Sequence, residues 1–192
     1  MELVDKLIAW DRSTFVYLNS LGVEQYDTFW ITVTNIFTWI PLFILFFVLV
    51  FIKHPKKEAF SIALTIVALI FFILFLTDIT KEFIERLRPN NEPAINGIIR
   101  ILKDPSSYSF FSGHASSSFS VTTLVVLFLR KKTKWVWLFY IWPLVFVTSR
   151  IYVGVHYPVD IIVGALVGTL TANLFYTMHR KFIKPYLGLV RL

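Results

Sequence analysis

Residues 111–129, FSGHASSSFSVTTLVVLFL, begin as a polar, histidine-bearing decapeptide and continue directly into an apolar run. A helix that enters lipid usually begins with hydrophobic residues or an aromatic anchor. Either this segment is buried protein that tolerates polarity, or its polar groups have a function. Ser112 is a good helix N-cap, and Gly113 lets the backbone bend or a ligand approach closely. His114 would then stand in the first helical turn, where free N–H groups and the helix dipole favour an anion.

Composition places the whole chain in a membrane. Of its 192 residues, 56% are hydrophobic and only 16% are charged, and the mean hydropathy is +0.68. These values are typical of a polytopic membrane protein with a single domain. The absence of cysteine excludes disulfides and thiolate metal sites. The net charge of +7 is explained better by basic cytoplasmic loops than by a nucleic-acid partner. Acidic residues interrupt the N-terminal residues, so we expect no signal peptide there.

Hydropathy predicts an all-α fold, a transmembrane helical bundle with five spans. Residues 1–25 place apolar side chains at helical spacing among charged ones, which predicts an amphipathic helix lying in the interface. A sixth, poorly hydrophobic span is the alternative. Residues 26–192 would form a transmembrane domain. The five expected spans are Thr28–Ile52, Ala59–Thr77, Ala115–Leu129, Trp135–Thr148 and Ile161–Met178.

Basic residues predict how the bundle is oriented. Clusters of Lys and Arg at 53–57, 130–134 and 180–184 fall on the same side after each pair of crossings. The positive-inside rule makes that side cytoplasmic, so we expect a multi-pass protein of the cell (inner) membrane. The loops Asp78–Phe111 and Ser149–Asp160 then share the outer face.

Two further clusters lie in those outer loops. Lys81 and Arg88 are seven residues apart and, if the preceding helix continues, project from the same face. Taken alone, they would be an ordinary basic flank that reaches the headgroups. His156 and Asp160 are four apart, so on a helix starting near Pro158 the carboxylate would come close to the imidazole.

Arg150 adds a guanidinium, whose planar fork of donors suits phosphate. An interfacial ion pair between Asp160 and Arg150 is the alternative role for this carboxylate. A lone histidine at position 114 would more often be a packing residue than a catalyst. Together, however, three cations, a helix N-terminus and two histidines on one membrane face are what phosphoryl transfer without a metal needs.

These residues resemble the type 2 phosphatidic acid phosphatases (PAP2), whose helical core is shared with vanadium haloperoxidases. The family motifs K-x6-RP, PSGH and SR-x5-H-x3-D match Lys81 to Arg88-Pro89, Ser112-Gly113-His114, and Ser149-Arg150 with His156 and Asp160. All spacings agree, across roughly the C-terminal two thirds of the chain. Phe111 stands where the family has proline. We expect this departure to alter loop rigidity or substrate contacts, because no reacting group is lost.

The resemblance implies a role for each matched residue. His156 would attack phosphorus and form a phosphohistidine, Asp160 would orient it, and His114 would protonate the leaving oxygen and later help water attack. The phosphoryl oxygens would be held by Lys81, Arg88, Ser112, Gly113 and Arg150. It implies neither a metal nor another cofactor.

The expected substrate is a lipid phosphate whose tails remain in the bilayer. Candidates are phosphatidic acid, phosphatidylglycerol phosphate, undecaprenyl pyrophosphate and phosphorylated lipid A. Residues 90–108 would form a lid or a loop that contacts the headgroup. In it, Arg100 and Lys103 would either contact a second anionic group or be solvated, and we favour solvation.

Other functions remain open at this point. A membrane transporter or a non-enzymatic phosphate-lipid-binding protein would also use helix ends and intramembrane charges. A haloperoxidase holding vanadate is less compatible with the membrane character. Gly164 and Gly168 fit a helix-dimer motif, although close packing within the bundle explains them better. The oligomeric state is left open.

Overall fold

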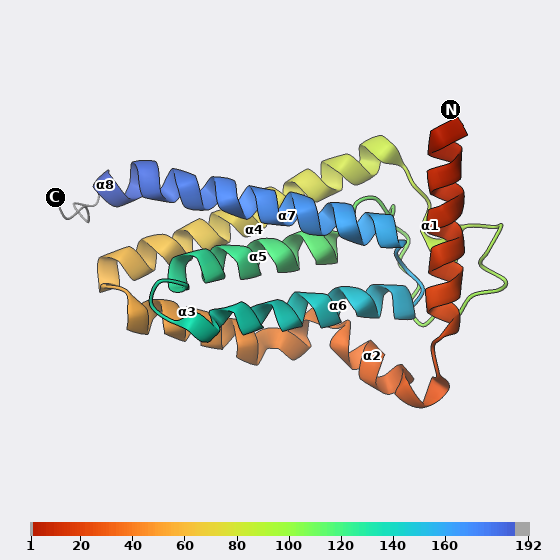
Figure 1. Ribbon diagram of the computed structural model, residues 1–192, viewed down its shortest axis with the longest axis horizontal. Helices are drawn as coiled ribbons and strands as arrows, with labels where there is room; N and C mark the ends of the chain where they lie inside the picture. The colour runs from red at the N-terminus through yellow and green to blue at the C-terminus, as the bar shows by residue number, and fades with distance from the viewer. Residues whose placement is uncertain (1, 187–192) are drawn as a thin grey trace.

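The structure is a computed structural model that describes residues 2–186. These residues form helices and no strand, which confirms the all-α prediction. Most of the helices run roughly side by side along the long axis, whereas α1 (Glu2–Ser20) crosses one end of the bundle (Figure 1). The elements are α1 (Glu2–Ser20), η1 (Glu24–Tyr26), α2 (Asp27–Val33), η2 (Ile36–Trp39), α3 (Ile40–Lys53), α4 (Lys56–Ile84), η3 (Pro89–Asn91), α5 (Gly113–Leu129), η4 (Lys134–Tyr140), α6 (Ile141–Tyr152), α7 (Pro158–Met178), the π-helical turn η5 (His179–Ile183) and α8 (Lys184–Tyr186).

The predicted spans correspond to α3, α4, α5, α6 and α7. Four helical segments are long and apolar enough to cross a membrane: Ile36–Lys53, Lys56–Asn91, Lys134–Tyr152 and Pro158–Tyr186. The fifth, α5, is shorter. It lies at the centre of the bundle, and most of its side chains, including Ser116, Ser118 and Ser120, are buried against protein. A helix enclosed by protein can begin with polar residues, because its hydrogen-bonding groups find partners there instead of facing lipid.

The prediction of one continuous span over Thr28–Ile52 is wrong in its first third. α2 ends at Val33, and a new helical segment starts after Asn35. The Asn35 side chain accepts a hydrogen bond from the Phe37 backbone N–H (3.1 Å), which caps the new segment. Pro41, in the first turn of α3, favours a helix start over a helix interior. The break lets α2 turn away from the bundle axis (Figure 1).

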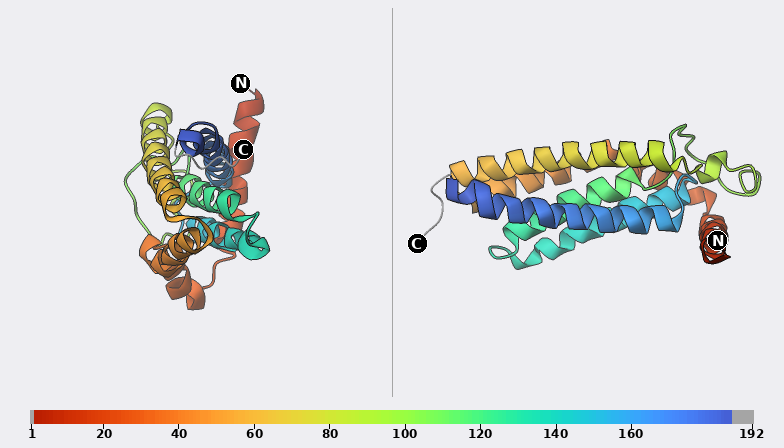
Figure 2. Two further views of the ribbon diagram at one scale, coloured as in Figure 1. Left: turned by 90° about the vertical axis from the view of Figure 1, so that its left-hand side faces the viewer. Right: turned by 90° about the horizontal axis from the view of Figure 1, so that it is seen from above.

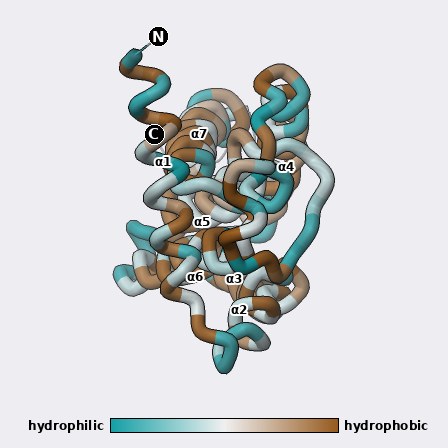
Figure 3. The backbone as a smooth tube through the Cα atoms, turned by 90° about the vertical axis from the view of Figure 1, so that its right-hand side faces the viewer, coloured by the Kyte–Doolittle hydropathy of each residue, from teal (hydrophilic) through white to brown (hydrophobic). Residues whose placement is uncertain are grey.

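The N-terminal helix lies across the bundle end and is seen end-on when the bundle is viewed from above (Figure 2). It is not among the segments apolar enough to span. Hydrophobic and hydrophilic residues alternate along it (Figure 3). These features favour the interfacial helix over a sixth span, while the domain boundary after residue 25 stays a prediction.

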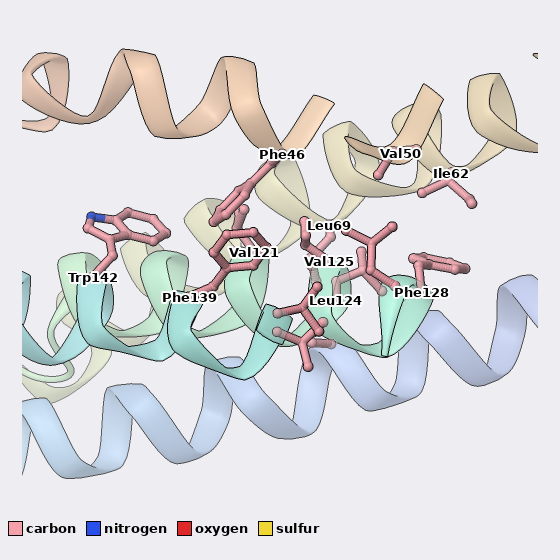
Figure 4. Close-up of a cluster of buried hydrophobic side chains, with 14 of the residues drawn as sticks. Phe46, Val50, Ile62, Leu69, Val121, Leu124, Val125, Phe128, Phe139 and Trp142 are labelled. Atoms are coloured by element: carbon pink, nitrogen blue, oxygen red, sulfur yellow. The ribbon is translucent and has the colours of Figure 1, made fainter. Parts of the chain in front are cut away.

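A core of large apolar side chains fills the half of the bundle remote from α1. Phe46, Leu69, Leu124, Val125 and Phe139 from α3, α4, α5 and η4 meet there (Figure 4). Many other large apolar side chains, such as those of α4 and α7 on the outer surface, are exposed. An exposed apolar belt is what a bundle surrounded by lipid requires.

Two glycines allow α7 to pack closely on α5. A Cβ atom at Gly164 would lie 2.7 Å from the Ser112 carbonyl oxygen, and one at Gly168 would collide with the Ser116 carbonyl. Gly164 and Gly168 therefore serve packing within this bundle, as the sequence favoured. This contact fixes where the N-terminus of α5 lies relative to α7.

We predict that Gly168→Ala lowers thermal stability, because the added methyl group overpacks the α5–α7 contact. The expected cost is about 1–3 kcal/mol. Gly97→Ala is the matched control, since a Cβ atom there meets nothing within 4 Å. Thermal unfolding of the two purified variants in detergent measures the difference. Equal midpoints for both variants would contradict the close-packing role.

Candidate active site

Lys81 and Arg88 reach the α1 end of the bundle by different routes. Lys81 lies in the last turn of α4, which ends at Ile84. Glu85 then adopts a left-handed conformation (φ 52°), and its N–H donates to the Lys81 carbonyl as a helix C-cap. Arg88 follows in extended backbone. The expectation that both cations project from one helix face is therefore wrong, although both still reach the same site.

The Arg88 guanidinium is buried and held in a fixed orientation. Its Nε donates to the Ser107 carbonyl (2.6 Å), and Nη2 donates to the Ser107 hydroxyl (3.0 Å). Nη1 donates to the Val155 carbonyl (3.0 Å) and lies 2.9 Å from Nε2 of His156. The long connection between α4 and α5 thus supplies the groups that aim Arg88 at the imidazole.

His156 and Asp160 pair as their spacing predicted, because α7 begins at Pro158. Nδ1 of His156 lies 3.4 Å from Oδ2 of Asp160. The same carboxylate oxygen accepts the Tyr157 backbone N–H (3.0 Å) and the Ser109 hydroxyl. Both side chains are fully buried. A carboxylate on Nδ1 leaves the lone pair of the ring on Nε2, the nitrogen to which Nη1 of Arg88 donates.

The N-terminus of α5 lies against this pair. Ser112 caps the helix through its side chain, and its N–H donates to the Asp160 carbonyl (3.0 Å). A Cβ atom at Gly113 would lie 4.0 Å from Nζ of Lys81, so the ammonium group lies beside this helix end. His114 packs its ring on Phe146 (centroids 5.2 Å apart). The positive charges of Arg150, Arg88 and Lys81 act on His114.

Arg150, near the end of α6, completes the group of cations. It is buried, and its Nη1 donates to the hydroxyl of Thr34, the residue at the break after α2. Its Nε has no hydrogen-bond partner in the described part of the chain. A buried, unpaired donor of this kind is costly unless a ligand accepts from it. The alternative of an Asp160–Arg150 ion pair is wrong, because Asp160 pairs with Arg86.

The environment keeps His156 neutral. Burial lowers the pKa of its imidazole well below the ordinary value, and the positive charges of Arg88, Arg150 and Lys81 lower it further. A neutral imidazole with Asp160 on Nδ1 has its lone pair on Nε2, which is the form that attacks an electrophile.

The structure adds functional contacts that the sequence reasoning missed. Arg86 donates to Asp160 and to Asp11 of α1, Ser109 donates to Asp160, and Thr34 accepts from Arg150. Only Arg86 carried a signal in the sequence, because it is a second arginine two residues before Arg88.

Arg100 lies outside the site. Its guanidinium pairs with both carboxylate oxygens of Asp27 (2.7 and 2.8 Å) and contacts the Tyr152 hydroxyl (3.3 Å). The interpretation of Arg100 as a solvated loop charge is therefore wrong, since it ties the long connection to α2 and α6. Lys103 makes no ion pair within residues 2–186, and Phe111 is buried beside Ser112.

The chain is similar in sequence to known phosphatases. The chain is 27% identical to the lipid A 4'-phosphatase of Porphyromonas gingivalis over 93% of its own length and 76% of the relative's. It is 35% identical to the undecaprenyl-diphosphatase of Sulfolobus acidocaldarius over 69% of this chain and 59% of that protein.

A solved structure shares the fold. The crystal structure of a PAP2-type phosphatidylglycerolphosphate phosphatase from Bacillus subtilis superposes with a TM-score of 0.74, covering 92% of this chain and 88% of the other at 21% identity. The family model described as the PAP2 superfamily matches residues 59–184, which hold every site residue that the sequence predicted. The chain belongs to the PAP2 superfamily.

Proposed function

We propose that this membrane lipid phosphatase cleaves a phosphomonoester or pyrophosphate on a lipid headgroup, with His156 as nucleophile. The observation that carries the mechanism is the convergence of Lys81, Arg88, Arg150 and the α5 N-terminus on one buried, neutral imidazole. Cations and N–H groups arranged in this way stabilise the charge of a phosphoryl group during transfer.

The reaction would proceed in two displacements. Nε2 of His156 bonds to phosphorus while the bond to the leaving oxygen breaks, and His114, protonated once the negative charge of the phosphate lies among the cations, gives that oxygen a proton. Water then attacks phosphorus, His114 takes a proton from it, and the N–P bond breaks to release phosphate. Since Nη1 of Arg88 lies 2.9 Å from Nε2, it is within reach of an oxygen on the phosphorus that Nε2 attacks.

A cavity suited to hydrocarbon supports a lipid substrate. It has a volume of about 360 Å³ and lies among α3, α4 and α5, with Phe43, Phe47 and Val67 among its lining residues. Ser117 and Ser118 also line it, one helical turn beyond His114. The substrate's chain would occupy this cavity while its phosphate lies in the site.

The site would face the outside of the cell membrane. The basic residues at the junction of α3 and α4, between α5 and η4, and in η5 lie at the opposite end of the helices from α1 (Figure 1). The positive-inside rule makes that end cytoplasmic, so the α1 end would lie at the outer headgroups.

We predict that His156→Ala abolishes phosphate release. Purified protein would be assayed with phosphatidic acid, phosphatidylglycerol phosphate, undecaprenyl pyrophosphate and lipid A. Lipid A and undecaprenyl pyrophosphate would be tested first, because two relatives are a lipid A 4'-phosphatase and an undecaprenyl-diphosphatase. Lys103→Ala is the control, because Lys103 lies in the outer loop without contacting the site. Turnover retained by His156→Ala would remove His156 as nucleophile, and no turnover of any lipid by the wild type would contradict the function.

Activity should survive chelation, because cationic side chains hold the phosphoryl oxygens where other phosphatases use metal ions. We expect an unchanged rate in EDTA and inhibition by vanadate, which imitates phosphorus bonded to five groups. Loss of turnover in EDTA that Mg²⁺ restores would contradict this mechanism.

His156 should stay uncharged at pH values at which a solvated histidine is protonated. With ¹⁵N-labelled histidine, the signals absent from His156→Ala identify this ring. Between about pH 7.5 and 5.5 we expect shifts of a neutral ring, because burial and neighbouring cations depress its pKa. A titration midpoint near the ordinary imidazole value would contradict the neutral nucleophile.

A further inference from the structure

Arg86 joins two buried carboxylates from distant parts of the chain. Its Nη1 donates to Oδ1 of Asp160, and its Nη2 donates to Oδ2 of Asp11, each at 2.7 Å. The side chain of Asp11 is 2% exposed and that of Asp160 is 0% exposed. Both terminal nitrogens of Arg86 are therefore engaged by carboxylates.

The two oxygens of Asp160 have different partners. Oδ2 faces His156 and also accepts from Tyr157 and Ser109, whereas Oδ1 accepts from Arg86. Within residues 2–186, Arg86 is the one cation that forms an ion pair with Asp160. Because a buried carboxylate needs a paired cation, the ion pair with Arg86 favours the ionised form of Asp160, whose Oδ2 faces the imidazole.

Helix α1 holds Arg86 and the start of α7 from outside. Oδ1 of Asp11 accepts the Val159 backbone N–H (2.9 Å) in the first turn of α7. One helical turn further on, Phe15 packs edge-on against Tyr157, with the ring centroids 5.4 Å apart. The Arg86 guanidinium lies over the same tyrosine ring, 4.1 Å from its centroid. The buried face of α1 therefore braces the turn that carries His156 and Asp160.

We propose that Asp11 and Arg86 are positioning residues for the reaction. Asp11 fixes Arg86, Arg86 fixes Asp160, and Asp160 orients His156 so that Nε2 faces phosphorus. Helix α1, which crosses the bundle end, thereby contributes to catalysis by positioning these side chains. This inference rests on the proposed function, because it assigns these residues to the step in which His156 attacks.

The test compares full-length Asp11→Asn, Asp11→Glu, Arg86→Lys and Arg86→Gln with Asp5→Asn. Asp5 lies on the same helix, is exposed and makes no ion pair in the described chain, so its variant is the matched control. Asp11→Asn should lower kcat on the order of tenfold, the usual effect of removing a group that orients a histidine. KM should stay within about twofold, because binding of the phosphate does not use Asp11. Asp11→Glu should restore part of the rate.

Inhibition separates positioning from general loosening of the site. Vanadate would inhibit by bonding to Nε2, whereas phosphate would bind through the cations. Asp11→Asn should raise the inhibition constant of vanadate about as much as it lowers kcat and leave that of phosphate unchanged. Equal weakening of both inhibitors would show a merely structural role and overturn the proposal.

A double-mutant cycle tests the order of the contacts. If Asp11 acts through Arg86, then Asp11→Asn costs nothing further in the Arg86→Gln background. Additive losses would overturn the proposal, as would a kcat for Asp11→Asn equal to that of Asp5→Asn. If Asp11→Asn does not fold, Arg86→Lys, which keeps the charge but loses the fork, supplies the same comparison of inhibitors. His156→Ala assayed alongside separates the two claims, since activity in it would end the proposed function itself.

Discussion

The close contact between α5 and α7 is the constraint on which the site depends. Gly164 lets the Ser112 carbonyl approach α7, and the Ser112 N–H donates to the Asp160 carbonyl at 3.0 Å. The first turn of α5 is thereby joined to the first turn of α7. The first turn of α5 carries His114, and the first turn of α7 carries Asp160, which lies beside His156. A wider separation would move the two histidines apart and leave no common place for a phosphoryl group.

The segments that converge on the site bring several buried charges close together. The site gathers positive charge from Lys81, Arg88 and Arg150. The Asp160 carboxylate balances this charge only in part, because it already pairs with Arg86, which also pairs with Asp11. Burying like charges together is unfavourable unless an anion joins them. A phosphoryl group would supply that anion, and Nε of Arg150, which has no hydrogen-bond partner among residues 2–186, would offer it a donor. The energy that binding releases at these cations is available to orient the headgroup against Nε2.

Much of the site could be predicted from sequence because its chemistry is carried by residues at fixed, short spacings. His156 and Asp160 are one helical turn apart, and Ser112 to His114 are contiguous, so local geometry already brings each set together. The helices could be predicted because lipid requires long apolar runs. No charged residue interrupts the stretch at Thr34 and Asn35, however, so the break in the first span was not expected. The extended path to Arg88 depends on the left-handed conformation of Glu85. Glutamate rarely adopts this conformation, so the sequence does not predict the turn.

The supporting contacts could not be predicted for a different reason. Asp11 and Arg86 are 75 residues apart, and Thr34 and Arg150 are 116 apart, so no periodicity relates them. An amphipathic pattern places Asp11 on a helix but does not say which face of the bundle that helix meets. Arg100 looked like an ordinary loop charge because its partner, Asp27, comes from a helix that hydropathy had merged into a span.

The central claim, that phosphorus bonds to Nε2 of His156, is tested most directly by trapping the intermediate. The protein would be mixed with a lipid whose phosphate is radiolabelled, quenched in alkali within one turnover, and digested for mass spectrometry. The account predicts an acid-labile, alkali-stable phosphoryl group on the peptide that carries His156, and none after the intermediate has been chased with unlabelled substrate. Phosphate release without any label on the protein, or a label on His114, would contradict it.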